Sequence, residues 1–426
     1  MSKISWKRVL TVFMALVMLS ALGIGNQAQA EEKTKIVFWY LWGGTEGGVI
    51  EEAIAEYNAQ SDKVVVEGLS VPDSQKILAA IAAGNGPDVV DDFSGGIGKM
   101  ASAGVLEPLD AYVEKTGYDL GGFVPAAVES CRMDGKLYSL PISVNLMGLY
   151  YNKALLKEAG YEEGPRTLEE MYEMAVATTK VNEDGTLDVA GFPDFPFVYY
   201  TNNFIAAAGG GWYTPEGKPA AADDEGNRIA LELARSYREQ FGLENVLRFQ
   251  AAGKYFDPTD PFVIGKQTFR VDGPWMGKNL REVLLSDLDY GVTYIPYPEA
   301  KPELEGRGVV GSSTMYIASN SKNKDAAWDF ISWFSAEGGQ KHMATKMGNF
   351  PSYLSLLSNE AVLAGYDMDF YTKLAQSPNL VTIPNGPQNG EYDTMVGEEV
   401  EQYVNLKQDI ETTLKNINTN GLRILR

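Results

Sequence analysis

Residues 134–153 constrain the fold of this chain more than any other stretch. The stretch opens with Asp134-Gly135, a turn-forming pair between two short β-prone runs. Pro141 lies inside the second run. Because proline cannot donate to a sheet ladder, this run belongs at a sheet edge or at a crossing between elements. Residues 146–151 then predict a strand buried on both faces, and a helix is expected to begin at Lys153.

The residues before this stretch alternate between strand and helix patterns. Apolar runs at 35–42, 63–69 and 89–90 are predicted strands, and the segments between them carry helical spacing, the second behind Asp73-Ser74 as a cap. The order β-α-β-α-β predicts a parallel sheet, and ligands bind at the carboxyl ends of such strands. The candidate ligand contacts at those ends are Trp42, Gly43, Gly44, Asp91, Asp92 and Ser94.

These patterns resemble the extracellular solute-binding proteins of ABC sugar importers, of the maltose- and multiple-sugar-binding kind. The resemblance rests on Asp134-Gly135-Lys136, with the aromatic residue and proline behind it, and on Tyr151-Asn152-Lys153. It extends to the runs at 84–90 and 321–331 and covers nearly the whole chain after residue 30. It implies an α/β, two-lobed periplasmic-binding-protein fold of type II. In that fold each lobe is a mainly parallel sheet flanked by helices, three crossings join the lobes, and the ligand lies between them.

The resemblance also divides the chain into lobes. We expect residues 31–144 and 307–335 in the first lobe and residues 145–306 and 336–426 in the second.

Residues 1–30 form a predicted signal peptide. Three basic residues precede the apolar run 9–22, and Ala28-Gln29-Ala30 is a small-x-small cleavage site. The apolar run is too short for a stable membrane span. The only cysteine, Cys131, lies too far from this site to serve as a lipid anchor there, so we expect it to be a small buried side chain. The expected location is the periplasm of a two-membrane cell.

The charge of the chain narrows the class of partner. Its formal net charge is −21, and cleavage after residue 30 would remove three cations and no anion, which gives −24. Such a surface repels nucleic acid and anionic lipid, so we expect neither as a partner. The charge does not choose between a neutral and a cationic ligand.

The resemblance supplies further candidate contacts from the crossings and from the second lobe. Asn145 lies at the first crossing, and in some oligosaccharide-binding relatives the matching position is acidic, which leaves the identity of the sugar open. Flat aromatic rings at loop ends, with short polar groups beside them, are what a sugar site needs. The remaining candidates are Tyr199, Tyr200, Asn202, Trp212, Asp272, Gly273, Trp275, Gly311, Ser312, Ser313, Phe350 and Tyr392.

Catalytic and metal chemistry have few residues to work with. His342 is the only histidine and lies in a helical pattern, where a surface or interface role is expected. Neighbouring strand residues point to opposite sides, so Asp91 and Asp92 are poorly placed as the facing carboxylates of a glycosidase. Residues 182–188 lack the full ligand spacing of a calcium loop and predict a hairpin turn. We expect no cofactor, no metal and no catalytic residue.

The expected function is capture of a sugar or small oligosaccharide and its delivery to the membrane permease subunits of an ABC transporter, by a monomeric protein. One alternative is the same scaffold holding a polyamine or another small polar solute, because Asp91, Asp92 and Asp272 would suit a cation. A phosphate ligand would need converging cations, for which Arg270 and Lys278 give little support. A secreted glycoside hydrolase is the alternative from another class. The sugar, its length and its anomeric form stay open.

Overall fold

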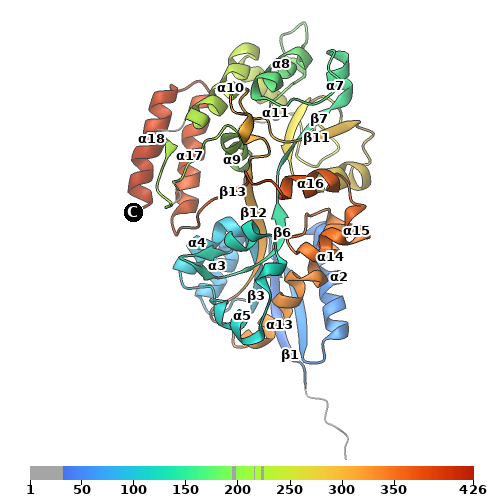
Figure 1. Cartoon of the computed structure of the whole chain (residues 1–426), viewed down its shortest axis with the longest axis vertical. Helices are drawn as coiled ribbons and strands as arrows, with labels where there is room; N and C mark the ends of the chain where they lie inside the picture. The colour runs from blue at the N-terminus through green and yellow to red at the C-terminus, as the bar shows by residue number, and fades with distance from the viewer. Residues whose placement is uncertain (1–31, 194–197, 215, 222–224) are drawn as a thin grey trace, which may run out of the picture.

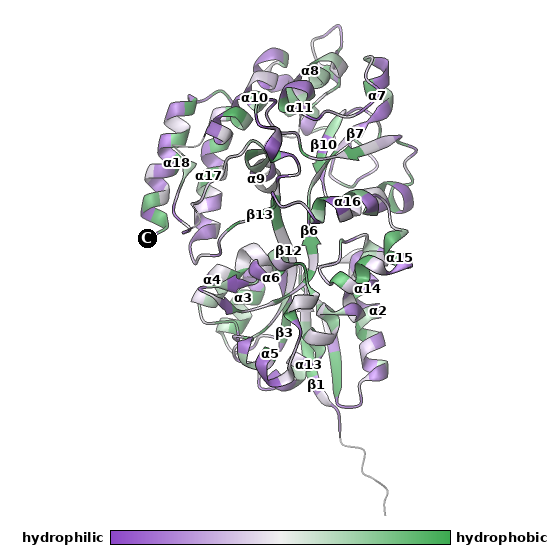
Figure 2. Cartoon of the chain, viewed as in Figure 1, coloured by the Kyte–Doolittle hydropathy of each residue, from purple (hydrophilic) through white to green (hydrophobic). Residues whose placement is uncertain are grey.

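The protein is described by a computed structural model that covers residues 32–193, 198–214, 216–221 and 225–426. Figure 1 shows two lobes, one above the other, with β6 (Leu140–Asn145) and β12 (Val309–Ile317) running between them. Figure 2 shows that the strands are mostly apolar, whereas the outer faces of the surrounding helices are polar. Within the described ranges, every helix is too short or too polar to cross a bilayer.

The first lobe is built on the predicted parallel strands. Strand β1 (Thr34–Tyr40) lies between β2 (Val64–Ser70) and β3 (Val89–Phe93) and is parallel to both. The intervening helices are α2 (Gly44–Gln60) and α3 (Ser74–Ala82). The carboxylate of Asp73 accepts a hydrogen bond from the Lys76 backbone N–H, which confirms the predicted cap of α3.

Strand β12 completes this sheet, and its first residues extend beyond β3. It runs antiparallel to β3 and to β6, and its first residues pair with β13 (Val381–Thr382). Strand β6 pairs only with β12 among the described strands, and Pro141 lies opposite Thr314 beside an irregularity in the register. The predicted placement of this proline run at an edge and a crossing is confirmed.

The sheet of the second lobe differs from the expectation of a mainly parallel sheet. Strand β7 (Gly148–Asn152) lies between β10 (Phe269–Asp272) and β11 (Tyr290–Thr293) and is antiparallel to both. The two outer strands run in the same direction because a helical crossover connects them, and β7 enters between them from the first crossing. The order of elements along the chain could not reveal this inserted partner.

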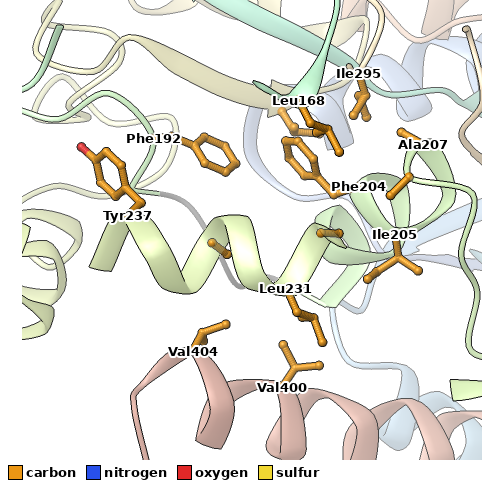
Figure 3. Close-up of a cluster of buried hydrophobic side chains, with 14 of the residues drawn as sticks. Leu168, Phe192, Phe204, Ile205, Ala207, Leu231, Tyr237, Ile295, Val400 and Val404 are labelled. Atoms are coloured by element: carbon orange, nitrogen blue, oxygen red, sulfur yellow. The ribbon is translucent and has the colours of Figure 1, made fainter. Parts of the chain in front are cut away.

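Helices enclose the core of the second lobe. Figure 3 shows Leu231 facing Val400 and Val404, with Phe192 and Phe204 in the same cluster. These residues join segments far apart in the sequence. The helices that contribute include α8 (Leu168–Thr178), α9 (Val198–Ala207), α10 (Glu225–Phe241), α17 (Asn389–Val404) and α18 (Ile410–Ile424).

The chain returns to the second lobe later than expected. Helix α13 (Lys324–Ser335) is followed by α14 (Glu337–His342) and a π-helical turn at Met343–Met347. Met343 and Met347 are buried in the core of the first lobe, and α14 packs against α2. Residues 337–347 therefore lie with the first lobe, where we had expected the second. Phe350 then lies beside the first crossing, where Val144 donates its backbone N–H to the carbonyl of Phe350 at 2.8 Å.

Two short hairpins confirm local predictions. Asp134 and Gly135, both with positive φ, join β4 (Arg132–Met133) to β5 (Lys136–Leu137). Strands β8 (Lys180–Val181) and β9 (Leu187–Val189) pair antiparallel around residues 182–186, as the hairpin interpretation required. The remaining α-helices are α4 (Ile97–Ser102), α5 (Asp110–Thr116), α6 (Pro125–Glu129), α7 (Lys153–Glu158), α11 (Leu243–Gln250), α12 (Trp275–Lys278), α15 (Glu360–Leu363) and α16 (Met368–Ala375).

Two single residues also lie where the sequence placed them. Cys131 is fully buried as a free thiol, and burial raises its pKa to about 12. His342 ends α14, and its Nε2 lies 2.7 Å from a carboxylate oxygen of Glu56 on α2. The histidine thus joins two helices of the first lobe.

Candidate functional site

A cavity of about 800 Å³ lies where the two lobes meet at the crossings, and we call it the cleft. First-lobe strand ends, crossing segments and second-lobe loops all contribute to its wall. The lining residues are Trp42, Glu46, Phe93, Ser94, Gly95, Ser130, Asn145, Met147, Asn202, Tyr255, Phe256, Trp275, Val309, Val310, Gly311, Ser312, Ser313, Asn349, Ile383, Asn385, Asn389 and Asp393.

Eight sequence-predicted residues meet in this cleft. Trp42 and Ser94 follow the carboxyl ends of β1 and β3, and Asn145 ends β6 at the first crossing. The remaining members come from β12 and from the second lobe, so the cleft joins parts of the chain more than 250 residues apart. The eight residues are Trp42, Ser94, Asn145, Asn202, Trp275, Gly311, Ser312 and Ser313.

The other predicted residues that the structure describes do not line the cleft. They are Gly43, Gly44, Asp91, Asp92, Trp212, Asp272, Gly273, Phe350 and Tyr392. Asp92, Trp212, Asp272 and Gly273 instead contact lining residues from behind the wall. Tyr199 and Tyr200 belong to helix α9, but their side chains lie outside the described part of the structure.

The two adjacent aspartates of β3 point away from each other. The carboxylate of Asp91 accepts the backbone N–H of Leu41 at 2.7 Å, whereas that of Asp92 accepts the Phe93 N–H at 2.7 Å. Burial raises the pKa of Asp91 well above its usual value, and the nearby Asp92 raises it further. Burial also raises the pKa of Asp92 to about 6. Asp91 fastens the end of β1, and neither aspartate is among the residues that line the cleft.

Trp212 and Tyr392 support a cleft residue from behind. The Trp212 indole Nε1 donates to Oδ1 of Asn202 at 2.7 Å, and the Tyr392 hydroxyl donates to the carbonyl of Trp212 at 2.9 Å. Both rings are buried in the second-lobe core. The Asn202 amide oxygen accepts this bond, so the amide N–H groups of Asn202 point away from the Trp212 indole. Phe350 is likewise fully buried, in a cluster that spans the crossings.

Sequence reasoning missed a large part of the wall. Tyr255 and Phe256 lie in the loop between α11 and β10, and their rings stack with centroids 3.9 Å apart. This loop is bounded by glycine, aspartate and proline, so the reasoning that selected Trp275 could also have found it. Residues 385–389, a loop rich in asparagine, glycine and proline, offered a similar signal. Glu46 and Asp393 lie in helical patterns and carried no signal of their own.

The second-lobe wall of the cleft is an aromatic surface with one tight packing constraint. Trp275 begins α12, and its Nε1 donates to the Tyr255 hydroxyl at 3.1 Å. The indole ring lies across Gly273, where a Cβ atom would be only 2.4 Å from the ring. Gly273 therefore leaves the room that the ring occupies.

The charges and polar groups of the cleft favour an uncharged, hydroxyl-rich ligand. Its described lining holds five asparagines and four serines, two carboxylates, Glu46 and Asp393, and no lysine or arginine. Burial raises the pKa of both carboxyls, and the Asp393 carboxylate accepts the Tyr213 hydroxyl at 2.7 Å. Amides and hydroxyls match the donors and acceptors of alcohol groups, and aromatic faces match C–H surfaces. An anion would meet two carboxyl groups and no lysine or arginine among these described lining residues.

A second cavity, of about 490 Å³, lies within the second lobe. Its wall includes Trp212, the buried Arg238 and Asn405, and Asn202 lines both this cavity and the cleft. Within the ranges that the structure describes, no three His, Cys, Asp or Glu side chains are grouped closely enough to hold a metal ion.

Comparisons with known proteins agree with this geometry. The family model of bacterial extracellular solute-binding proteins matches residues 42–341. The chain is similar to the maltotriose-binding protein of Pyrococcus abyssi, with 28% identity over 83% of this chain and 76% of that protein. It is 26% identical to the sn-glycerol-3-phosphate-binding periplasmic protein of Brucella melitensis over 94% of this chain and 95% of that protein. The solved structure of CpMnBP1 with mannotriose bound covers 91% of this chain and all of its own, with a TM-score of 0.80 and 26% identity.

Proposed function

Because the chain belongs to the bacterial extracellular solute-binding proteins, we propose that it is the substrate-binding component of an ABC transporter for an uncharged sugar or small oligosaccharide. The observation that carries this proposal is the lining of the cleft. Aromatic rings from both lobes lie there beside nine amide and hydroxyl side chains, without a cation among the described lining residues. Maltotriose, in the name of one relative, and mannotriose, bound in the solved structure of CpMnBP1, have the chemistry that such a wall would recognise.

The crossings explain how binding could be transmitted to a partner. The cleft is lined by both lobes, so a ligand held there contacts both walls at once only when the lobes lie close together. Such a ligand shifts the hinge equilibrium toward the closed form by its difference in affinity for the two forms. The closed protein then presents both lobes to the permease subunits as one surface.

Several further features complete the proposal. Residues 1–30 direct export and are removed, and the mature protein acts as a monomer in the periplasm.

The protein binds its ligand without chemical change, because the cleft-facing groups are suited to hydrogen bonding and the aspartates of β3 point apart. Trp42, Ser94, Asn145, Asn202, Trp275 and residues 311–313 are the proposed ligand contacts among those predicted from sequence.

A polyamine is the second candidate, favoured by one observation. Glu46 and Asp393 place two carboxylates in the cleft, and an extended cation could pair with them. Glycerol phosphate, the ligand in the name of the Brucella relative, fits poorly, since its phosphate would face two carboxylates and no cation of the described lining.

A thermal-shift panel separates these candidates. The mature chain is heated with mannobiose, mannotriose, maltotriose, spermidine or glycerol 3-phosphate. A ligand at 100 times its dissociation constant adds about 2.7 kcal/mol to the free energy of unfolding, which raises the melting temperature measurably. We expect a shift with at least one neutral sugar and none with glycerol phosphate. A shift with spermidine alone would move the assignment to a polyamine receptor, and one with glycerol phosphate alone would overturn the reading of the cleft.

Replacing Gly273 with alanine is expected to weaken sugar binding about tenfold, or about 1.4 kcal/mol. The added methyl group would overlap the Trp275 ring and displace it from the cleft wall. Isothermal titration with the sugar found by the panel measures the loss. Gly390→Ala is the matched control, because nothing lies within 4 Å of a Cβ at that second-lobe position. Equal affinities for the two variants would refute the packing argument.

A further inference from the structure

We propose that Asp272 is a positioning residue, which fixes the Tyr255 hydroxyl and through it the Trp275 indole as one aromatic platform for the sugar. This inference rests on the proposed function and deepens it, because it assigns a role to a residue that does not itself reach the cleft. It also replaces the sequence-based expectation that Asp272 contacts the ligand directly.

A directed chain of hydrogen bonds connects the three side chains. Trp275 Nε1 donates to the Tyr255 hydroxyl at 3.1 Å, and that hydroxyl donates to Oδ1 of Asp272 at 2.9 Å. The backbone N–H of Gly273 donates to the same Oδ1 at 2.8 Å. The tyrosine oxygen accepts one bond and donates another, so both its direction and its distance from the indole are set by the carboxylate behind it.

The burial of the three side chains separates their roles. Asp272 is fully buried, whereas the Tyr255 side chain is 50% exposed and Trp275 lines the cleft. A ligand in the cleft can therefore touch the two rings but not the carboxylate. Tyr255 also stacks on Phe256, which extends the platform by a third ring.

The backbone of Asp272 is held as well. The Tyr371 hydroxyl of α16 donates to the Asp272 backbone carbonyl at 3.1 Å and lies 3.0 Å from the Tyr150 hydroxyl of β7. Burial raises the pKa of Asp272 to about 7, although the neighbouring Arg270 opposes the rise. Burying a carboxyl group costs free energy. The presence of one at this position is explained if it orients the two rings, because an apolar side chain could not accept the hydrogen bond from Tyr255.

A double-mutant cycle tests the relay. Affinity for the sugar found by the panel is measured by titration for wild type, Tyr255→Phe, Asp272→Ala and the double variant. We expect about a tenfold loss for Asp272→Ala and for Tyr255→Phe, and less than a further twofold loss when Tyr255→Phe is added to Asp272→Ala. Equal tenfold losses from Tyr255→Phe in both backgrounds, or wild-type affinity for Asp272→Ala, would overturn the proposal.

Asp272→Asn keeps an acceptor oxygen and guards against a variant that fails to fold. It should bind within threefold of wild type, and Tyr255→Phe should cost about tenfold in this background. A tenfold loss for Asp272→Asn alone, with an unchanged melting temperature, would contradict the role of the acceptor oxygen.

A readout without ligand keeps this test separate from the proposed function. The emission of Trp275 is obtained as the difference between a protein and its Trp275→Phe variant. We expect Tyr255→Phe to shift this emission and Tyr57→Phe to leave it unchanged. Tyr57 donates to Asp329 at 2.5 Å in the first lobe, so its variant removes a matched bond away from the cleft. Unshifted emission in Tyr255→Phe would overturn the relay whether or not any sugar binds.

Discussion

Replacing Trp275 with alanine is expected to weaken sugar binding about 30-fold or more, which corresponds to about 2 kcal/mol or more. The indole lines the cleft and is only partly buried against the second-lobe core, and its Nε1 donates to the Tyr255 hydroxyl, so its removal strips the platform of its largest ring. Titration calorimetry on the mature protein gives the affinity, and thermal unfolding gives the stability. We expect the melting temperature without ligand to change by only a few degrees.

Trp333→Ala is the control for this experiment, because it should show the opposite pattern. Trp333 packs on Tyr57 in the first lobe, with ring centroids 5.2 Å apart, and does not line the cleft. Its loss should lower the melting temperature and leave the affinity unchanged. If Trp275→Ala kept wild-type affinity, the aromatic wall would not be a binding surface.

Replacing Asp260 with alanine is expected to lower the free energy of unfolding by about 3–5 kcal/mol, because it removes one partner of a buried ion pair. Asp260 is fully buried, and its carboxylate lies 2.6 Å from Nη1 of Arg270, whose side chain is only 9% exposed. The same carboxylate accepts the backbone N–H groups of Phe256 and Phe262. Loss of these bonds should also release the loop that carries the aromatic platform and weaken sugar binding. Denaturant unfolding and calorimetry measure the two effects.

The exposed ion pair between Lys115 and Asp325 provides the matched control. Its atoms are 3.1 Å apart, but both side chains are more than 60% exposed. Asp325→Ala should therefore cost about 0–1 kcal/mol and leave the affinity unchanged. Similar losses of unfolding free energy for Asp260→Ala and Asp325→Ala would show that a buried ion pair contributes no more to stability than an exposed one.

Local rules predicted those parts of the fold that a few neighbouring residues decide. Asp73 caps its helix, Asp134-Gly135 forms its turn, and Pro141 lies on a strand with one partner. Strand ends on a parallel sheet likewise placed Trp42 and Ser94 in the cleft, because such ends meet at one edge.

Features that depend on the path of the chain escaped these rules. Strand β7 pairs with strands more than 100 residues away in the sequence, so the order of elements around it could not predict its antiparallel neighbours. Asp272 and Trp212 have the residue types of ligand contacts, yet each turns inward and holds a cleft residue instead. Whether a polar side chain reaches the cleft or supports its wall depends on tertiary packing, which spacing along one segment does not encode.

A crystal structure of the mature protein with the neutral sugar that gives the largest thermal shift tests the central claim most directly. Our account predicts density for one ligand in the cleft, with sugar rings against Trp42 and Trp275 and hydroxyls within hydrogen-bonding distance of Asn145 or Asn202. Density in the second-lobe cavity beside Arg238, with the cleft empty, would contradict the account and move the binding site to the far side of Asn202.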